Sequence, residues 1–319
     1  MGNESEASVL VSIVVPCLDE EEVFPLLQSA LLSVAKEMEP SVTVEFVLVD
    51  DGSRDATWSL ICAFARVDGR VRGVSLSRNF GQQMAITCGY DVARGDAVVS
   101  LDADLQDPPE LVPRLVEAWR AGADVVYAVR SRRRGEGLFK RISAALFYRL
   151  LRWIGASTIR EASGDFRLLS RRALDALGEL REQHRFVRGM VGWVGFKSSE
   201  IEYERAPSAA GRSKYPLTKM LRLATDAMVS FSVFPLRLTF VFAGILALFV
   251  LGYVANAALQ WFVLGVEPVR GWMSLLVSVM AFGALNLFCI GIMGEYVGRI
   301  YEQVKGRPLY VVRALTPED

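Results

Sequence analysis

The sequence predicts an α/β domain built on a parallel sheet, followed by two helices that span a membrane. From residue 9 to residue 130, short runs rich in valine alternate with segments of helical hydrophobic spacing. Such alternation is typical of a parallel sheet with helices on both faces. Two uncharged apolar runs follow at residues 238–263 and 272–294. Each is longer than the about 20 residues that cross the hydrocarbon core of a bilayer.

The composition agrees with a soluble domain joined to a more apolar part, because 52% of the residues are hydrophobic and 23% are charged. The net charge of zero gives no reason to expect a nucleic acid partner. The four cysteines are scattered and the chain has a single histidine. This argues against both a zinc site and a disulfide framework.

The elements of the N-terminal domain follow one another in a regular order. We expect strands at residues 9–16, 42–50, 71–77, 97–102 and 123–130, and helices at about residues 20–36, 56–66, 81–93 and 109–122. In sheets of this kind, ligands bind beyond the carboxyl ends of the strands. Polar side chains at those ends are therefore candidates for a functional site.

The two apolar runs are joined only by residues 264–271, so they predict a hairpin with both flanks on one side of the membrane. Basic residues lie near its outer ends: Lys219, Arg222 and Arg237 before the first run, and Arg299, Lys305 and Arg307 after the second. The positive-inside rule then places both ends of the chain in the cytosol.

Residues 217–235 have apolar residues at helical spacing among a few charges and are expected to lie along the membrane surface. Packing on the N-terminal domain is the alternative. The predicted parts are a cytosolic domain (1–216), a juxtamembrane helix (217–235), a transmembrane hairpin (236–296) and a cytosolic tail (297–319).

The fourth predicted strand ends on acidic residues. In "VVSLDADLQDPPE", Asp102 and Asp104 are two positions apart, so in an extended segment they would face the same way. Two carboxylates on one face repel unless a cation holds them, and oxygen ligands suit Mg²⁺ or Mn²⁺. Gln106 could add its amide oxygen. The alternative is a polar loop whose aspartates cap the next helix.

The second predicted strand ends in a similar way, on "DDGSRDAT". Asp50 and Asp51 stand at its carboxyl end, and Asp55 can cap the following helix. A carboxylate at this place can accept a hydrogen bond from a base or ribose hydroxyl, and a capped turn without a ligand is the alternative. The chain has neither a GxGxxG fingerprint nor a P-loop.

Several segments together resemble glycosyltransferase family 2, of fold type A, and within it the polyisoprenyl-phosphate glycosyltransferases. The segments, in chain order, are "VVPCLDEEE" (14–22), "VDDGSRD" (49–55), "SRNFG" (77–81), "DADLQDPPE" (102–110), "GDFRLLSR" (164–171), "FVRGMVGWVGF" (186–196), "GRSKY" (211–215) and "GEYVGRIYEQVKGRPLY" (294–310). The resemblance covers nearly the whole chain beyond residue 10. It implies a Rossmann-like, nucleotide-sugar-binding domain.

The resemblance implies a role for each matching residue. Asp102 and Asp104 correspond to the metal-binding motif, with Gln106 as a further ligand of Mg²⁺ or Mn²⁺. The implied nucleotide-sugar contacts are Pro16, Leu18, Glu20, Asp50, Asp51 and Asp102. Asp165, Asp104 and Arg130 are the implied catalytic residues, with Asp165 acting as a base or as an organiser of the acceptor. A buried structural salt bridge between Asp165 and Arg167 is the alternative.

The implied contacts with the acceptor's phosphate are Arg130, Arg212 and Lys214, to which we add Arg132 of the basic segment 130–141. Arginine side chains match the geometry of phosphate oxygens. The alternative for this basic segment is a solvated loop, or one attracted to an anionic membrane surface.

The resemblance implies transfer of a hexose from a nucleotide sugar to a polyprenyl phosphate, with inversion, on the cytosolic face of the inner membrane. Its motifs favour UDP-glucose and undecaprenyl phosphate over GDP-mannose. A non-catalytic membrane subunit that handles a lipid-linked sugar is an alternative from another class. A processive polysaccharide synthase would carry a QxxRW segment, which is absent here. The expected partners are the donor, the lipid acceptor and the bilayer, without nucleic acid, and a homo-oligomer is compatible.

Overall fold

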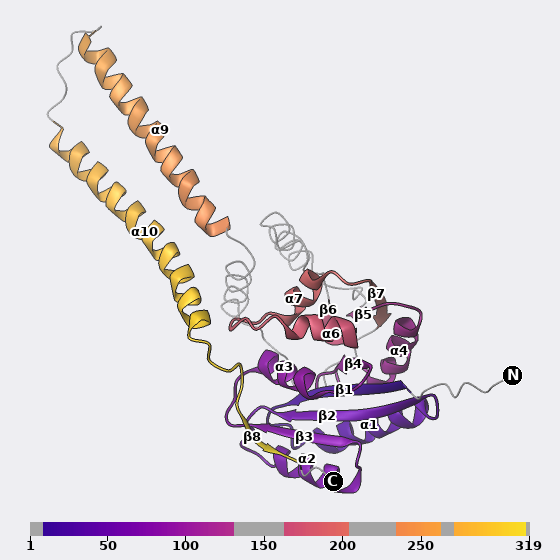
Figure 1. The fold of residues 1–319 in the computed structure, drawn as a ribbon. Coiled ribbons are helices and arrows are strands. Elements are labelled where there is room, and N and C mark those ends of the chain that lie inside the picture. Colours follow the sequence, from indigo (N-terminus) through magenta and orange to yellow (C-terminus); the bar gives the residue numbers. More distant parts are fainter. Residues whose placement is uncertain (1–8, 131–162, 204–233, 263–270, 317–319) are drawn as a thin grey trace. The chain divides into compact units, whose positions relative to one another are not determined.

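The computed structural model describes residues 9–130, 163–203, 234–262 and 271–316 (Figure 1). The chain divides into two compact units. One contains residues 1–148, 158–214 and 307–319, and the other contains residues 149–157 and 215–306. The predicted juxtamembrane helix at residues 217–235 lies almost entirely outside the described residues.

The first unit contains an eight-stranded sheet with the strand order β7-β5-β6-β4-β1-β2-β3-β8. Its strands are β1 (Val9–Cys17), β2 (Val42–Asp50), β3 (Val71–Leu76), β4 (Ala97–Ser100), β5 (Val125–Arg130), β6 (Ser163–Ser170), β7 (Ser198–Tyr203) and β8 (Val312–Leu315). Its helices are α1 (Phe24–Met38), α2 (Thr57–Val67), α3 (Gln82–Val92), the 3₁₀ turn η1 (Pro109–Leu111), α4 (Val112–Arg120), α6 (Arg171–Gly178) and α7 (Val187–Val194).

The predicted α/β class and the first five strands are confirmed, but the sheet is mixed rather than parallel. Strands β1 to β4 are parallel to their neighbours in that group, whereas β6 runs antiparallel to both β4 and β5. β8 is likewise antiparallel to β3. The expectation of a parallel sheet was wrong because it considered only residues 9–130. The two antiparallel strands come from later segments that insert between β4 and β5 or add to the edge.

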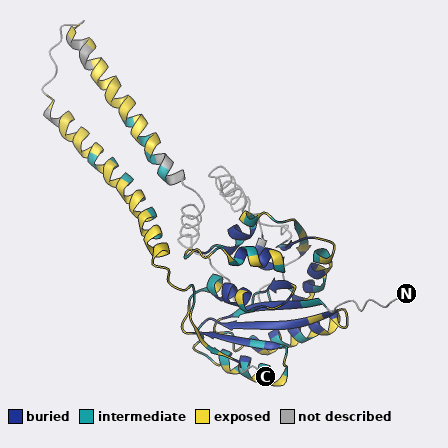
Figure 2. Ribbon diagram, in the orientation of Figure 1, coloured by how far each residue is buried: buried dark blue, intermediate teal, exposed yellow. Residues whose placement is uncertain are grey.

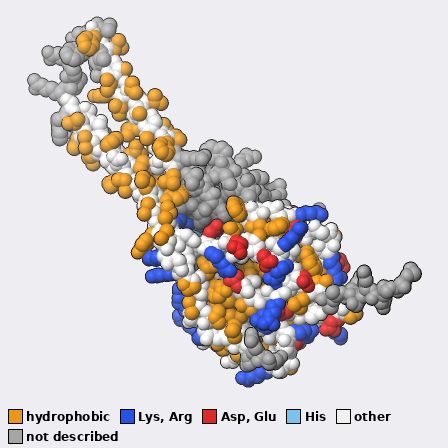
Figure 3. Space-filling model, viewed as in Figure 1, with side chains coloured by type: hydrophobic (Ala, Val, Ile, Leu, Met, Phe, Trp, Pro, Cys, Tyr) orange, Lys and Arg blue, Asp and Glu red, His pale blue; other side chains and the backbone are white. Residues whose placement is uncertain are grey.

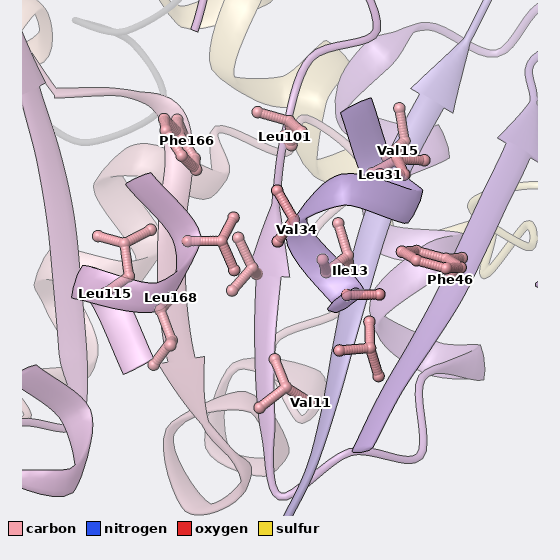
Figure 4. Packing of buried hydrophobic residues seen from close by; sticks show 14 of the residues in the cluster. Val11, Ile13, Val15, Leu31, Val34, Phe46, Leu101, Leu115, Phe166 and Leu168 are labelled. Atoms are coloured by element: carbon pink, nitrogen blue, oxygen red, sulfur yellow. The ribbon is translucent and has the colours of Figure 1, made fainter. Parts of the chain in front are cut away.

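Alternate residues of each strand point to the same face of the sheet. On one face, these side chains pack against α1, α2 and α4. Val11, Ile13 and Val15 of β1 belong to a single core cluster with Leu31 and Val34 of α1 (Figure 4). All five side chains are almost fully buried. Full burial of an aliphatic side chain of this size contributes about 2 kcal/mol to stability.

The opposite face of β1 packs against α3. Val14 points away from the cluster around Ile13, and a methyl group added to Gly89 of α3 would lie 2.1 Å from its Cγ1. The glycine therefore lets α3 approach the sheet closely. This close packing sets the position of the amino end of α3, which reaches the functional site described below.

The second unit contains two long helices, α9 (Phe234–Phe262) and α10 (Trp272–Val304). The Phe242 and Phe288 rings pack edge to face with their centroids 6.0 Å apart, so the helices form a hairpin. Both helices are long and apolar enough to cross a membrane, judged by length and composition. Their apolar side chains are largely exposed, in contrast to the buried strands of the sheet (Figures 2 and 3).

The second long helix continues beyond the predicted apolar run, which ends at residue 294. It extends through a charged segment to Val304. Within this segment, Arg299 Nε donates to Oε1 of Glu295, which lies one helical turn before it, at 2.9 Å. The chain then returns to the sheet as β8. The described part of the segment treated above as a separate tail, residues 297–316, is thus divided between α10 and the sheet.

Candidate active site

The loops that follow β1 and β2 are joined by hydrogen bonds between their backbones and side chains. The Asp19 amide donates to Ser53 Oγ at 3.0 Å, and the Arg54 amide donates to Asp19 Oδ1 at 2.8 Å. The Glu20 amide donates to Thr57 Oγ1 at 2.9 Å. These bonds fix both loops at the carboxyl ends of neighbouring parallel strands, where a ligand site is expected.

The β2 loop also approaches the loop after β3 so closely that only glycine fits at its tip. Gly52 has a φ of +74°, and an added Cβ would lie 2.4 Å from the carbonyl carbon of Arg78. Glycine adopts positive φ without steric cost. The three loops after β1, β2 and β3 therefore form one continuous rim.

Asp50 and Asp51 are both buried and hold this rim together. Asp50 accepts from Ser75 Oγ at 2.7 Å and from the Ser53 amide at 2.9 Å. Because Asp50 has no exposed surface, its role in this structure is to anchor the loop. Asp50 therefore has no accessible atom with which to make the expected contact with a nucleotide.

Asp51 accepts hydrogen bonds from the amides of Phe80 and Gly81, at 2.8 and 2.9 Å. Burial raises the pKa of Asp51, although these two hydrogen bonds act in the opposite direction. The carboxylate thereby ties the β2 loop to the residues immediately before α3. Asp55, expected to cap the next helix, accepts from the Thr57 amide at 3.0 Å, in the first turn of α2.

The remaining residues of the expected nucleotide pocket come from the β1 loop. Pro16 is half-buried at the end of β1, and Leu18 is 40% exposed. Burial raises the pKa of Glu20, and the negative charges of Asp104 and Asp55 add to this effect. Glu20 is thus close enough to feel Asp104, so the β1 loop and the acidic loop after β4 border the same space.

The acidic loop after β4 is a turn rather than an extended segment. β4 ends at Ser100, and Leu105 has a positive φ of 53°. Asp102 is half-buried, whereas Asp104 is exposed and accepts at Oδ1 from the Gln106 amide at 3.0 Å. The expectation that the two carboxylates face alike along an extended strand was therefore wrong in its premise. The turn nevertheless brings the two carboxylates near each other, as shown by the negative charge of Asp104, which raises the pKa of Asp102.

Burial, together with the smaller effects of the negative charges of Asp165, Asp107 and Asp104, raises the pKa of Asp102 to about 6, while Arg188 acts in the opposite direction. Gln82 Nε2 donates to Asp102 Oδ1 at 2.7 Å. A partly buried carboxylate among other carboxylates is an environment that a cation would stabilise.

Among the described residues, no group of three or more acidic, histidine or cysteine side chains is arranged to hold a metal. Mg²⁺ and Mn²⁺ do not need such a cage when one or two carboxylates act together with substrate phosphates and water. Asp102 and Asp104 fit that mode of binding. Gln106 lies in the same turn.

Asp165 lies in β6 with its carboxylate almost fully buried. Arg167 Nη2 donates to Oδ1 at 2.6 Å, and Arg188 donates to both oxygens, from Nε at 3.0 Å and from Nη2 at 2.9 Å. Gln83 Nε2 donates to Oδ2 at 3.2 Å. The ion pair with Arg167, which was the alternative reading of this residue, is present, but it is only one part of a larger network.

Burial alone would raise the pKa of Asp165, but the hydrogen bond from Arg188 and the charges of Arg167 and Arg188 outweigh burial, so the pKa is lowered. A carboxylate held ionised in this way is a weak base. The network therefore favours the organising role for Asp165 over proton transfer.

Three residues that bind these carboxylates were not singled out from the sequence: Gln82, which binds Asp102, and Gln83 and Arg188, which bind Asp165. Gln83 accepts from the Val187 amide at Oε1 at 3.1 Å while its amide nitrogen binds Asp165. It thus joins α3, β6 and α7. One feature of the sequence could have indicated Gln82 and Gln83: they form a polar pair directly after Gly81, at the amino end of a predicted helix.

Arg130 ends β5 and is held beside this network. Its Nε donates to the Tyr203 hydroxyl at 3.1 Å, and its Nη2 donates to Asp107 Oδ1 at 3.2 Å. The Tyr203 hydroxyl in turn donates to Asp107. Arg130 and Arg188 are near enough to influence each other electrostatically.

The site therefore combines the carboxylates of Asp102, Asp104 and Glu20 with the guanidinium groups of Arg130 and Arg188. Such an arrangement can bind a metal ion and the anionic groups that it bridges. Arg132, Arg212 and Lys214, expected to bind the acceptor's phosphate, lie outside the described residues.

The chain is similar to several known proteins over most of its length. The sequence model of Glycosyl transferase family 2 matches residues 12–178. The chain is 43% identical to the uncharacterized glycosyltransferase YkcC of Bacillus subtilis over 95% of this chain and 93% of that protein. It is also 43% identical to the SfII prophage-derived bactoprenol glucosyl transferase of Shigella flexneri, over 95% of this chain and 97% of that protein.

Among solved structures, the chain resembles glucosyl-3-phosphoglycerate synthase from Mycobacterium tuberculosis in complex with Mn²⁺, uridine diphosphate and glucosyl-3-phosphoglycerate. The identity is 19%, the alignment covers 70% of this chain and 79% of that one, and the TM-score is 0.49. The family match spans more than half of the chain, including the β1, β2 and β4 loops and Asp165. The chain belongs to glycosyl transferase family 2.

Proposed function

We propose that this protein transfers glucose from UDP-glucose to a membrane polyprenyl phosphate, with undecaprenyl phosphate as the acceptor, and inverts the anomeric carbon. The observation that carries the proposal is the full-length match to a bactoprenol glucosyl transferase, which includes the segments of both apolar helices. This similarity favours glucose over mannose as the transferred sugar.

The proposed reaction needs a group that offsets the charge of the leaving diphosphate. A divalent cation, Mg²⁺ or Mn²⁺, held by Asp102 and Asp104 with Gln106 nearby, would supply that positive charge. The raised pKa of Asp102 supports this assignment, because burial and the neighbouring carboxylates disfavour its charged form, which a bound cation would favour. Pro16, Leu18 and Glu20 border the space proposed for the nucleotide sugar, and the buried Asp51 holds the β2 loop beside it.

The acceptor's phosphate is anionic at neutral pH, so its oxygen needs placement more than deprotonation. One acceptor oxygen bonds to the anomeric carbon while the bond from that carbon to the donor's diphosphate breaks. The diphosphate leaves with the bonding electron pair, and the single displacement inverts the carbon. Arg188 and Arg130 are placed to bring the two anions together. Asp165 holds Arg188 in position by accepting at both oxygens.

We also propose that α9 and α10 cross the inner membrane and that both flanks of the hairpin lie on its cytosolic side. The basic residues at the outer flanks support this orientation. The exposed apolar surfaces of the two helices, visible in Figure 3, are consistent with contact with lipid. The sheet domain would then meet both substrates from the cytosolic side.

The experiment is a competition between UDP-glucose, GDP-mannose and UDP-N-acetylglucosamine in membranes that contain the purified full chain and undecaprenyl phosphate. The lipid product is identified by mass spectrometry. A glucosyl monophosphate lipid formed only from UDP-glucose supports the proposal. A mannosyl lipid from GDP-mannose alone would contradict the choice of sugar, and no organic-soluble product would favour a non-catalytic membrane subunit.

A further inference from the structure

The chain that follows α10 forms the outermost strand of the catalytic sheet. β8 pairs antiparallel with β3, and the bonds continue beyond it: the Ser77 amide donates to the Val311 carbonyl at 2.8 Å. At the other end, the Gly73 amide donates to Thr316 Oγ1 at 2.9 Å. The final described segment, residues 307–316, is therefore built into the same unit as the functional site.

Side chains of this segment also hold it against α3. The Tyr310 hydroxyl donates to Asp91 Oδ2 at 2.8 Å, and Asp91 is paired with Arg181 at 2.7 Å. Gln183 Nε2 donates to the Arg307 carbonyl at 2.5 Å. These contacts fix the segment before Val311, and the pairing of β8 with β3 fixes it after Val311, so the place of Arg313 on the edge strand is defined.

Arg313 reaches from this edge strand to the anchor of the β2 loop. Cys17, Asp50, Ser75 and Ala314 form a row of paired positions across β1, β2, β3 and β8. Next to this row, Arg313 Nη2 donates to Ser75 Oγ at 2.8 Å and lies 3.6 Å from Asp50 Oδ2.

A relay of hydrogen bonds then leads to the loop. Ser75 Oγ donates to Asp50 Oδ2 at 2.7 Å, and Asp50 Oδ1 accepts from the Ser53 amide at 2.9 Å. Ser53 Oγ accepts in turn from the Asp19 amide. A fully buried carboxylate depends strongly on its hydrogen-bond donors and on a nearby cation. Arg313 supplies that cation from outside the family match, which ends at residue 178.

We propose that Arg313 is a positioning residue for nucleotide-sugar binding, which acts through Ser75 and Asp50 on the β2 loop. The inference rests on the proposed function in that the loop is taken to border the nucleotide. It follows that the donor site contains residues that precede the two apolar helices in the sequence and one residue, Arg313, that follows them. A bare edge strand would only cap the sheet, and that role would not require a cation beside Asp50.

The test uses the full chain in detergent with Arg313→Ala, Arg313→Lys and Ser75→Ala. We expect Arg313→Ala to raise the KM for UDP-glucose about tenfold with kcat changed less, because a charged hydrogen bond to the loop anchor is lost. Arg313→Lys should restore most of the affinity. The KM for undecaprenyl phosphate should stay the same. Arg66→Ala, in the last turn of α2, is the matched control.

A double-mutant cycle separates the relay from general loss of stability. Arg313→Ala combined with Ser75→Ala should weaken donor binding by no more than the larger single change, because both variants break one chain of contacts. Additive effects, or a fall in kcat at unchanged KM for the donor, would overturn the proposal in favour of a purely structural edge strand.

Nucleotide binding is measured separately by titration calorimetry with UDP and Mn²⁺. If the wild-type protein does not bind UDP, the proposed function itself has failed. If the wild-type protein binds UDP and Arg313→Ala binds it equally well, the function stands and the role of Arg313 is refuted. Weaker binding by Arg313→Ala, with rescue by Arg313→Lys, supports the role of Arg313 whichever acceptor is used.

Discussion

Arg188 and Asp165 form a two-point ion pair that joins the first turn of α7 to β6. Arg188 Nε lies 3.0 Å from Asp165 Oδ1, and Nη2 lies 2.9 Å from Oδ2. The carboxylate is almost fully buried, whereas the Arg188 side chain is 40% exposed. The buried partner therefore fixes the orientation of a guanidinium that remains accessible to an anion.

We expect Arg188→Ala to lower kcat by about 100-fold, which is typical for removal of a positioned donor to developing negative charge. Steady-state transfer assays measure the change. The matched control is Arg172→Ala, because Arg172 also makes a two-point contact, with Asp124, through Nε and Nη2. Similar losses in both variants would show that the effect comes from stability rather than from the site.

Asp104→Asn should reduce turnover by about 100-fold or more while the fold persists, because a charged metal ligand is lost next to the diphosphate. Asp104 is exposed, so its replacement leaves no buried group unpaired. Turnover is measured over a range of Mn²⁺ and Mg²⁺ concentrations. Glu110→Gln, at an exposed position in η1, serves as the control. Normal turnover of Asp104→Asn after chelation of metals would rule out the metal assignment.

The raised pKa of Asp102, about 6, predicts a pH-dependent stability of the metal-free protein. Well below about pH 4 the carboxyl is protonated in both the folded and the unfolded state and contributes no difference. Between about pH 4 and about pH 6 the unfolded state ionises while the folded state stays protonated, so stability falls as the pH rises and levels off above about pH 6.

Asp102→Asn should therefore raise the Tm of the metal-free protein at about pH 7.5 and leave it unchanged near about pH 3.5. Added Mn²⁺ should raise the Tm of the wild type and have little effect on the variant, because ligand binding stabilises the folded state. Thermal unfolding in detergent provides both measurements. A lower Tm for the variant at neutral pH would contradict the stated environment of Asp102.

Gly52→Ala should destabilise the protein by about 2 kcal/mol, since the new methyl group meets backbone atoms and the residue has a positive φ. Gly81→Ala is the matched control: its φ is +100°, but an added Cβ has no neighbour within 4 Å. Chemical unfolding of both variants separates the cost of the clash from the cost of the dihedral angle. Equal destabilisation would mean that the close approach to Arg78 has no consequence.

The orientation of the hairpin is tested with single cysteines in a cysteine-free background. A cysteine at Val266, outside the described residues, should react with an impermeant thiol reagent in intact cells, because the connection is expected to face outward. Ser5→Cys should react only after the membrane is made permeable. A cysteine at Thr316, near the other end of the chain, would be a poor control, because the side chain at this position is buried against β3. Labelling of Ser5→Cys in intact cells would reverse the proposed topology.

The comparison of sequence and structure is clearest at the two acidic loops. Asp51 and Asp102 could be assigned to the carboxyl ends of their strands, since each directly follows a short valine-rich run. Their individual surroundings could not be assigned. The sequence treats Asp50 and Asp51 as an equivalent pair, yet Asp50 is bound by Ser75 and Ser53, and Asp51 by the backbone before α3.

The antiparallel strands illustrate the same difference. β6 was recognised as a sequence motif but not as a strand, and β8 was assigned to a tail. Neither is preceded by the strand–helix alternation that identified β1 to β5. Their places in the sheet depend on pairing with strands that are distant in the sequence.

The sequence by itself determined the alternation of strands and helices, the acidic residues that follow β2 and β4, and the two apolar helices. These features depend on hydrophobic spacing and on charge within a few neighbouring residues. Only the tertiary structure brings Gln83 and Arg188 to Asp165, and Arg313 to Ser75. Gln83 reaches Asp165, and Arg313 reaches Ser75, across long intervals of chain. Such contacts are set by the order and register of the strands, which local sequence patterns do not specify.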